Sequence, residues 1–199
     1  HLEDMVFLGH IDGTRDAVHF IRKLRDLLLG HTQRDLQTSV KWDGAPAIYM
    51  GPHPVSKKFF VAKKSLFNKR PLYYTSVKEI KASTDLSAEL KKKFELAFDM
   101  FHDAKFEKII QGDFLFDASD LKTETIDGVK YVVFHPNTIA YSVPADSDLG
   151  KEISNKEMGI VFHTTYSGSS ISSLTAKAGV TLPKLSDKVW AVDANYNMT

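Results

Sequence analysis

The spacing of apolar residues changes along the chain, and this change limits the possible folds more than any other feature. Helical spacing occurs first between Thr14, a predicted N-cap, and Gly30, a predicted C-terminal stop. It returns after Ser87, where one helical face would carry Leu90, Phe94, Ala97, Phe98 and Phe101. Two amphipathic helices are therefore expected.

Short runs rich in β-branched and aromatic residues make up most of the remaining chain. These predicted strands occupy residues 36–40, 47–50, 57–65, 108–116, 129–136, 138–144 and 159–166, with Asp, Gly, Asn and Pro between them. Residues 36–51 are expected to form a strand, a turn and a strand, residues 120–128 a polar loop, and residues 171–178 a last helix. The pattern predicts an α+β fold with largely antiparallel sheet, made of an N-terminal helical segment, 1–35, and a core, 36–199.

Composition excludes several classes of protein. The 199 residues, 43% of them hydrophobic, are enough to bury one sizeable core. Twenty-six Lys and Arg against 25 Asp and Glu leave a net charge of +1, so no global field indicates a nucleic-acid or membrane partner. The absence of cysteine excludes disulfides, thiolate metal sites and cysteine nucleophiles. Without a signal peptide or a long apolar run, we expect a cytoplasmic protein.

Several common kinds of site are also disfavoured. The eight histidines are dispersed, with no H-x-x-x-H spacing for a zinc ion. Neither a P-loop nor a G-x-G-x-x-G fingerprint occurs, and residues 167–170 lack the nucleophile-elbow pattern. Asp113 and Asp117 form an acidic pair of the kind found in hydrolases, but no histidine-rich cluster accompanies them.

The stretch SVKWDGAPAIYMG, residues 39–51, places Lys41, Asp43 and Gly44 between two apolar runs. Two interpretations are open. Asp-Gly is a frequent turn dipeptide, and the lysine would then be a solvated strand end. Alternatively the lysine is a nucleophile, which must lose its proton to attack and is best held, partly buried, on a rigid turn. A nearby glycine would let a phosphate ester approach the backbone.

The segment KWDGAPA resembles the K-x-D-G motif of the covalent nucleotidyltransferase superfamily: ATP-dependent DNA ligases, RNA ligases and messenger-RNA capping enzymes. The resemblance implies that Lys41 attacks the α-phosphate of ATP, releases pyrophosphate and keeps AMP as a phosphoramidate. It assigns Asp43 to orienting this lysine or engaging magnesium indirectly, and Gly44 to admitting the phosphate. ATP and Mg²⁺ are the implied cofactors.

The segment AKKSLFNK, residues 62–69, resembles a basic-serine element of these ligases through Lys63, Lys64 and Ser65. The implied role of Lys64 and Ser65 is to hold oxygens of the nucleotide or of a nucleic-acid end. The alternative is an exposed basic strand edge, which protects a sheet against aggregation. This element slightly favours an RNA ligase over a DNA ligase, and nucleic-acid ends become an expected partner.

The segment IIQGDFLF, residues 109–116, resembles motif III of the superfamily, with Gly112 and Asp113 at the nucleotide-binding positions. Asp113 would contact the ribose or the metal, although its side chain is one methylene shorter than the usual glutamate. A Gly-Asp pair at a strand end is otherwise an ordinary turn. Phe134, in YVVFHP, is the aromatic expected to stack on the base. Its alternative is a core position, as for most phenylalanines.

Two later motifs of the superfamily are not matched. Met158 stands where a metal-binding glutamate is expected. Near the C-terminus no Lys-x-Lys pair occurs, and Lys177, Lys184 and Lys188 lie outside the expected context. The resemblance covers roughly residues 36–144. We expect the chain either to end before those motifs or to have lost catalysis, and truncation is the favoured explanation.

The sequence thus predicts a nucleotidyltransferase fold, similar to a ligase adenylation domain, and an ATP-dependent ligase-type adenylyltransferase. The whole chain also resembles uncharacterised ligase-like proteins of tailed bacteriophages, which would place it in the host cytoplasm and away from membranes. A non-catalytic nucleotide- or nucleic-acid-binding module on the same fold is the alternative. A phage structural or interaction domain without a ligand is a third possibility.

Overall fold

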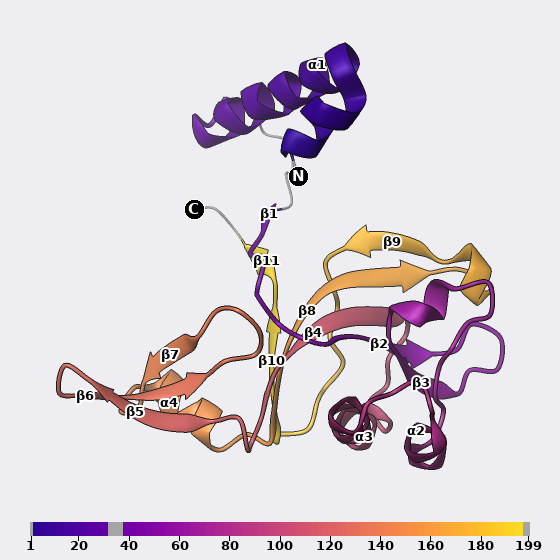
Figure 1. Ribbon diagram of the computed structural model, residues 1–199, viewed down its shortest axis with the longest axis vertical. Helices are drawn as coiled ribbons and strands as arrows, with labels where there is room; N and C mark the ends of the chain where they lie inside the picture. Colours follow the sequence, from indigo (N-terminus) through magenta and orange to yellow (C-terminus); the bar gives the residue numbers. More distant parts are fainter. Residues whose placement is uncertain (1, 32–37, 197–199) are drawn as a thin grey trace. The chain divides into compact units, whose positions relative to one another are not determined.

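The computed structural model describes residues 2–31 and 38–196 (Figure 1). The chain divides into two compact units, residues 1–38 and residues 39–199, and each is described by itself. The predicted domain boundary between residues 35 and 36 lies outside the described residues, as does the start of the predicted strand 36–40.

The first unit is a helix that folds back on itself. Helix α1 (Leu2–Leu28) is broken at His10, whose φ of 51° is not helical. The close approach requires Gly13, since a Cβ there would lie 1.9 Å from the carbonyl oxygen of Met5. The predicted N-cap is wrong, because Thr14 lies inside the helix and donates a hydrogen bond to the carbonyl of His10. The predicted stop at Gly30 is confirmed by its φ of 68° and its hydrogen bond to the Leu27 carbonyl.

The second unit is built on a six-stranded sheet in the order β10-β8-β4-β2-β3, with β9 paired to β8. Its strands are β2 (Ala47–Pro52), β3 (Phe59–Ala62), β4 (Ile109–Asp117), β8 (Met158–Ser167), β9 (Thr175–Ala178) and β10 (Val189–Asp193). All neighbours are antiparallel except β10 and β8. A three-stranded antiparallel sheet contains β5 (Lys122–Ile126), β6 (Val129–Phe134) and β7 (Tyr141–Pro144).

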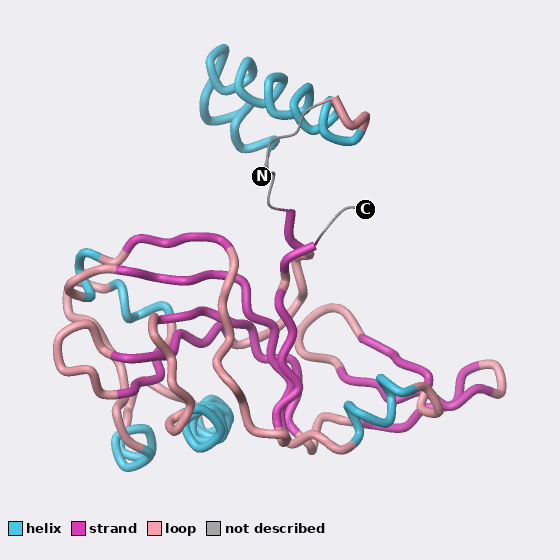
Figure 2. Tube along the Cα trace, turned by 180° about the vertical axis from the view of Figure 1, so that it is seen from behind, coloured by secondary structure: helices cyan, strands magenta, loops and turns pink. Residues whose placement is uncertain are grey.

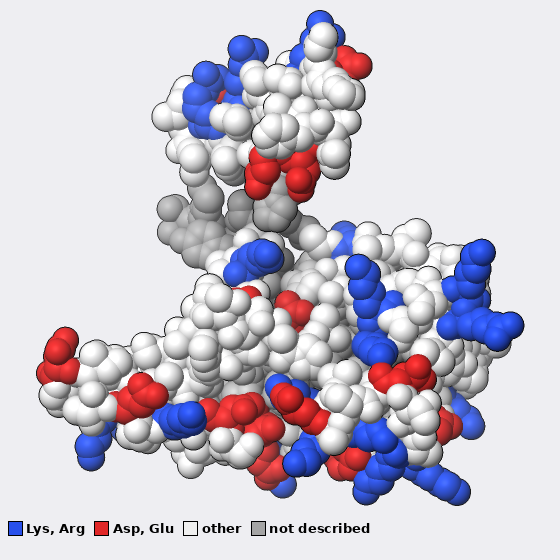
Figure 3. Space-filling model, in the orientation of Figure 1, with Lys and Arg blue, Asp and Glu red and all other residues white. Residues whose placement is uncertain are grey.

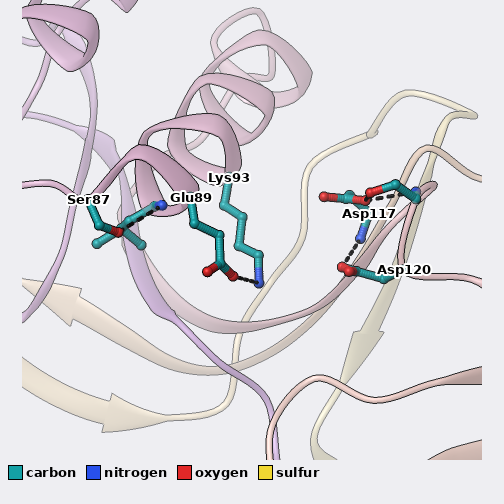
Figure 4. Close-up of polar contacts among 7 residues, drawn as sticks. Ser87, Glu89, Lys93, Asp117 and Asp120 are labelled. Atoms are coloured by element: carbon teal, nitrogen blue, oxygen red, sulfur yellow. Dashed lines mark hydrogen bonds and ion pairs between the residues drawn. The ribbon is translucent and has the colours of Figure 1, made fainter.

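Helices α2 (Val77–Ala82) and α3 (Ala88–Phe101) lie together on one side of the six-stranded sheet, as Figure 2 shows from behind. The predicted cap of α3 is confirmed, since the Ser87 hydroxyl accepts from the Leu90 amide (Figure 4). The buried face of α3 packs on alternate residues of β2, β4 and β8, because side chains alternate along a strand. Lys93 of α3 extends over the ring of Phe114 on β4, 5.2 Å from its centroid.

Two smaller apolar clusters complete the core. One joins the two sheets and includes Phe116, Phe134 and Trp190, beside helix α4 (Asp148–Ser154). The other lies under the 3₁₀ turns η1 (Lys64–Phe67) and η2 (Ile171–Ser173). In the described part of the chain, no helix combines the length and apolar character needed to cross a membrane.

The α+β class with mainly antiparallel sheet is confirmed, and so are most predicted strands. In the described part of residues 36–51, β1 (Thr38–Ser39) and β2 are separated by an irregular loop, and β1 pairs with β11 (Asn195–Tyr196) and not with β2. Two local predictions are wrong. Residues 122–126 form strand β5 instead of a polar loop, and residues 171–178 form a single 3₁₀ turn followed by β9 instead of a helix.

Candidate functional site

The segment that carries Lys41 is an irregular loop tied to the sheet on both sides. Before the lysine, the Val40 amide donates to the carbonyl of Ala194 at 2.8 Å. After it, the Ala45 amide donates to the Phe114 carbonyl at 2.9 Å, and the Phe114 amide donates back to Pro46 at 3.0 Å. The loop therefore continues the pairing of β2 with β4.

Asp43 links this loop to residues 137–139, which connect β6 to β7. The Asp43 Oδ1 atom accepts from Asn137 Nδ2 at 2.8 Å. Its Oδ2 atom accepts from the amides of Thr138 and Ile139 at 2.6 and 2.8 Å. These hydrogen bonds, that of Asn137 most strongly, hold the pKa of Asp43 below its usual 3.8. The carboxylate thus fixes the shape of the loop.

Aromatic packing fixes the residue between Lys41 and Asp43. The Trp42 ring stacks on Tyr141 at a centroid distance of 5.3 Å and meets Trp190 edge-on at 6.2 Å. The Tyr141 hydroxyl also accepts a hydrogen bond from the Asp43 amide at 2.8 Å. Lys41 itself is exposed, so the expectation of partial burial is wrong. A rigid backbone therefore presents a lysine side chain to solvent.

Close packing requires a glycine at both predicted nucleotide-binding positions, Gly44 and Gly112. A Cβ on Gly44 would lie 2.7 Å from the Cβ of Asp113. A Cβ on Gly112 would lie 2.7 Å from both the Phe162 ring and the Val161 carbonyl oxygen. The space that a Cβ would occupy at each glycine is therefore already filled by protein.

Asp113 lies in a line of half-buried polar side chains on β4 and β8, which we call the polar strip: Gln111, Asp113, His163, Thr164 and Tyr166. The register jumps from the pair Gln111–Thr164 to the pair Gly112–Phe162, which leaves His163 as the extra residue of a β-bulge. The bulge places His163 Nε2 3.6 Å from Asp113 Oδ2, while His163 Nδ1 lies 2.7 Å from the Thr164 hydroxyl. Since Gly44 packs on Asp113, the polar strip begins beside the Lys41 loop.

The far end of the polar strip is aromatic. The Tyr166 hydroxyl donates to Gln111 Oε1 at 2.7 Å, and the Tyr166 ring packs against Tyr49 of β2. Burial, with smaller effects from Tyr166 and Asp113, raises the pKa of Tyr49 to about 12. Burial also raises the pKa of Tyr166. Both phenols are therefore neutral hydrogen-bonding groups at physiological pH.

The basic-serine element lies in η1, just after β3. Lys64 is exposed, while the Ser65 hydroxyl oxygen is buried and has no hydrogen-bond partner among the described residues. The neighbouring Lys63 donates to the Asp85 carbonyl at 2.6 Å. Within residues 2–31 and 38–196, no hydrogen bond or ion pair joins Lys64 or Ser65 to the Lys41 loop.

Phe134 is a core residue and not an exposed base platform. Its side chain is 2% exposed, stacks on Tyr141 at 5.3 Å, and also packs against Phe116 and Trp190. The burial tendency of phenylalanine therefore outweighs the expected stacking role. Trp42 in the Lys41 loop and Tyr141 beside it are both half-buried, which makes them more accessible than Phe134.

In the part of the chain that the structure describes, no group of three His, Asp or Glu side chains is arranged to hold a metal ion. Asp113 therefore stands as a single carboxylate next to His163. Asp117 stabilises a local turn with Ser119 and Asp120 (Figure 4), which gives it a structural role in place of the hydrolase role considered above.

The two unmatched motifs would lie at Met158, on β8, and near Lys188, next to β10. These strands are neighbours, since β8 and β10 pair in parallel with Met158 opposite Val189. Met158 is fully buried. Glu157 and Lys188 form an ion pair at 2.7 Å, at the ends of these strands. Asp113 of the polar strip pairs with Val161, which lies further along β8 than Met158. The basic group of β8 that lies beside Asp113 is His163.

One comparison with known proteins gives a match. A family model described as a family of unknown function, DUF6267, matches residues 1–199. No curated protein and no solved structure matches the chain. Because the family model spans both units, the chain belongs to the DUF6267 family.

Proposed function

We propose that residues 39–199 form a nucleotidyltransferase-type fold whose function is that of an ATP-dependent polynucleotide ligase, with Lys41 as the residue that becomes adenylylated. One observation carries this proposal: the three hydrogen bonds to the Asp43 carboxylate fix a loop that leaves the Lys41 side chain exposed. A merely solvated lysine would not need a loop that is fixed both by residues 137–139 and by Ala194. RNA ends are the preferred second substrate, on the basic-serine resemblance alone.

The reaction needs only one nucleophile in its first step. The unprotonated Lys41 Nζ attacks the α-phosphorus of ATP and forms a P–N bond, while the bond from that phosphorus to the bridging oxygen breaks. Pyrophosphate leaves with the bonding electron pair, and the nitrogen loses a proton to solvent. Asp43 acts as a positioning residue, because its oxygens are already engaged by residues 137–139.

Asp113 is the carboxylate best placed to meet the bound nucleotide, because it packs directly against Gly44. A single carboxylate fits Mg²⁺, which keeps most of its waters and is held largely by substrate phosphates. When bound, the ion would neutralise charge on the α-phosphate and the leaving pyrophosphate. His163, 3.6 Å from Asp113, orients that carboxylate.

Intact-mass spectrometry after incubation with MgATP tests the proposal. We expect a gain of one AMP, about 329 Da for the phosphoramidate of a lysine nucleophile. Lys41→Ala and Lys41→Arg should both abolish the gain, since arginine keeps the charge but is not a nucleophile under these conditions. Lys130→Ala removes another exposed lysine, on β6, and should adenylylate like the unmodified protein.

The outcomes separate the candidate functions. An adduct that survives Lys41→Ala would refute the assignment of the nucleophile. ATP binding without any adduct would indicate the non-catalytic binding module, which the lack of a Lys-x-Lys pair near the C-terminus favours. Absence of both binding and adduct would leave an interaction domain as the better description.

A further inference from the structure

Phe67 is an exposed aromatic ring supported by two tyrosines. Its side chain, at the end of η1, is 43% exposed. The Phe67 ring lies 5.2 Å from Tyr49 and 5.4 Å from Tyr166, and these two rings lie 5.7 Å from each other. We call Tyr49, Phe67 and Tyr166 the aromatic triad. Tyr49 is buried and Tyr166 is held by Gln111, so the exposed ring rests on a fixed support.

Positive charge gathers around this ring although the whole chain is nearly neutral. From Gly44 to Val77 the sequence has no Asp or Glu, and its basic residues are Lys57, Lys58, Lys63, Lys64, Lys69 and Arg70. Lys64, Lys69 and Arg70 are exposed, within three residues of Phe67. Figure 3 shows blue side chains at the right-hand edge of the molecule, near η1. Among the described residues, no carboxylate forms an ion pair with these three.

We propose that the aromatic triad and the exposed cations Lys64, Lys69 and Arg70 form a binding surface for single-stranded nucleic acid. The unpaired base stacks on Phe67, and the cations contact the flanking phosphates. This inference deepens the proposed ligase function, on which the choice of partner rests. The inference places the nucleic acid at the aromatic end of the polar strip, beside Tyr166. The other end of the strip is Asp113, which packs on Gly44 of the Lys41 loop.

The chemistry favours an unpaired strand over the other polyanions. An aromatic face next to cations matches the stacking and phosphate contacts of single strands, whereas the stacked bases of a duplex are not available to a ring. A membrane surface requires several exposed apolar side chains together with the cations. From Gly44 to Val77, every residue of which is described, Val55 and Phe67 are the only large hydrophobic residues that are exposed.

Fluorescence anisotropy with labelled oligonucleotides of about 12 nucleotides, a length within the usual site sizes, tests the inference. Oligo-U RNA, oligo-dT DNA and a duplex of the same length are titrated with the full chain in the absence of ATP. Phe67→Ala and Phe67→Leu should each weaken single-strand binding by about tenfold, because neither side chain offers an aromatic face for base stacking. Phe67→Tyr should restore it.

Charge variants give an independent measurement. The log of the association constant for a single strand falls as the log of the salt concentration rises. Lys69→Gln with Arg70→Gln should make this slope shallower by about 0.7 for each phosphate that the protein no longer neutralises. Lys122→Gln with Lys130→Gln, on β5 and β6, removes two other exposed charges and should leave the slope unchanged. Similar binding of RNA and DNA would show that the backbone sugar is not read, and that result supports the stacking mechanism.

The inference is overturned if neither single strand binds, if the duplex binds equally well, or if Phe67→Leu binds like the unmodified protein. Its failure is distinct from that of the proposed function, because the titration contains no ATP. A chain that forms lysyl-AMP but binds no strand contradicts this inference alone. A chain that binds the strand but forms no lysyl-AMP contradicts the proposed function alone.

Discussion

Gly44→Ala separates the packing role of this glycine from the phosphate-admitting role that the K-x-D-G resemblance implies. The new methyl group would lie 2.7 Å from the Asp113 Cβ and 3.0 Å from the Phe114 carbonyl oxygen. Both neighbours belong to β4, which is paired on both sides and cannot move away easily. Overpacking of this kind costs roughly 1–3 kcal/mol of unfolding free energy. Breaking the hydrogen bond from Ala45 to Phe114 would add about 1 kcal/mol.

Urea unfolding followed by tryptophan fluorescence measures this destabilisation, since Trp42 and Trp190 are the only tryptophans and contact each other beside the loop. The expected change of about 2–4 kcal/mol corresponds to a fall in Tm of roughly 4–16 °C for a chain of this size. Gly9→Ala, whose new Cβ would have no atom within 4 Å outside the neighbouring backbone of its own helix, is the control and should leave the tryptophan transition unchanged. Unaltered stability of Gly44→Ala, with AMP transfer abolished, would refute the packing explanation and favour the phosphate role.

Three further predictions concern single side chains. An NMR titration should place the pKa of Asp43 below 3.8, so ionised Asp43 stabilises the fold above pH 3.8 and this contribution is lost as the pH falls through the folded-state pKa. Asn137→Ala should raise that pKa, and an unchanged value would contradict the hydrogen-bond account. An absorbance titration should show Tyr49 ionising near pH 12, which means that its stabilising effect, complete below pH 10, is lost as the pH rises from 10 to 12. Tyr49→Phe should remove one phenol from that late step, and an identical curve would show the assignment to be wrong. Phe134→Ala should cost about 3–5 kcal/mol in urea unfolding, because a buried ring leaves a cavity. A cost below about 1 kcal/mol, with ATP binding abolished, would favour the base-stacking role instead.

Local sequence signals correctly predict the helices and strands whose apolar residues, spaced as in that element, pack into the core. The Ser87 cap and the apolar face of α3 are examples, because that face packs on the sheet. Strand β5 escapes prediction because all its side chains are exposed and only its pairing with β6 makes it a strand. The Asp127–Gly128 turn, with positive φ at both residues, is the signal for this hairpin. The capping box at Ser170 begins only one 3₁₀ turn, because the following residues pair with β8.

In the candidate site, too, some residues could be predicted from the sequence and others could not. The motif identifies Lys41 and Asp43, but the residues that hold Asp43 lie more than ninety positions away and no local pattern connects them. His163 has the sequence context of an ordinary strand, since the bulge that directs it toward Asp113 depends on the register between β4 and β8. The close packing of Gly44 and Gly112 on neighbouring residues escapes prediction, because a sequence does not show which backbone approaches a glycine.

The most direct test of the central claim is to locate the AMP group after incubation with Mg²⁺ and ATP labelled on the α-phosphate. The labelled protein is digested at neutral pH, and the labelled peptide is sequenced by mass spectrometry. The account predicts one labelled site, Lys41, with label that is released by acid as expected for a phosphoramidate. Label on any other residue, or none on a chain that still binds ATP, would contradict the claim that the Asp43-anchored loop presents a nucleophile.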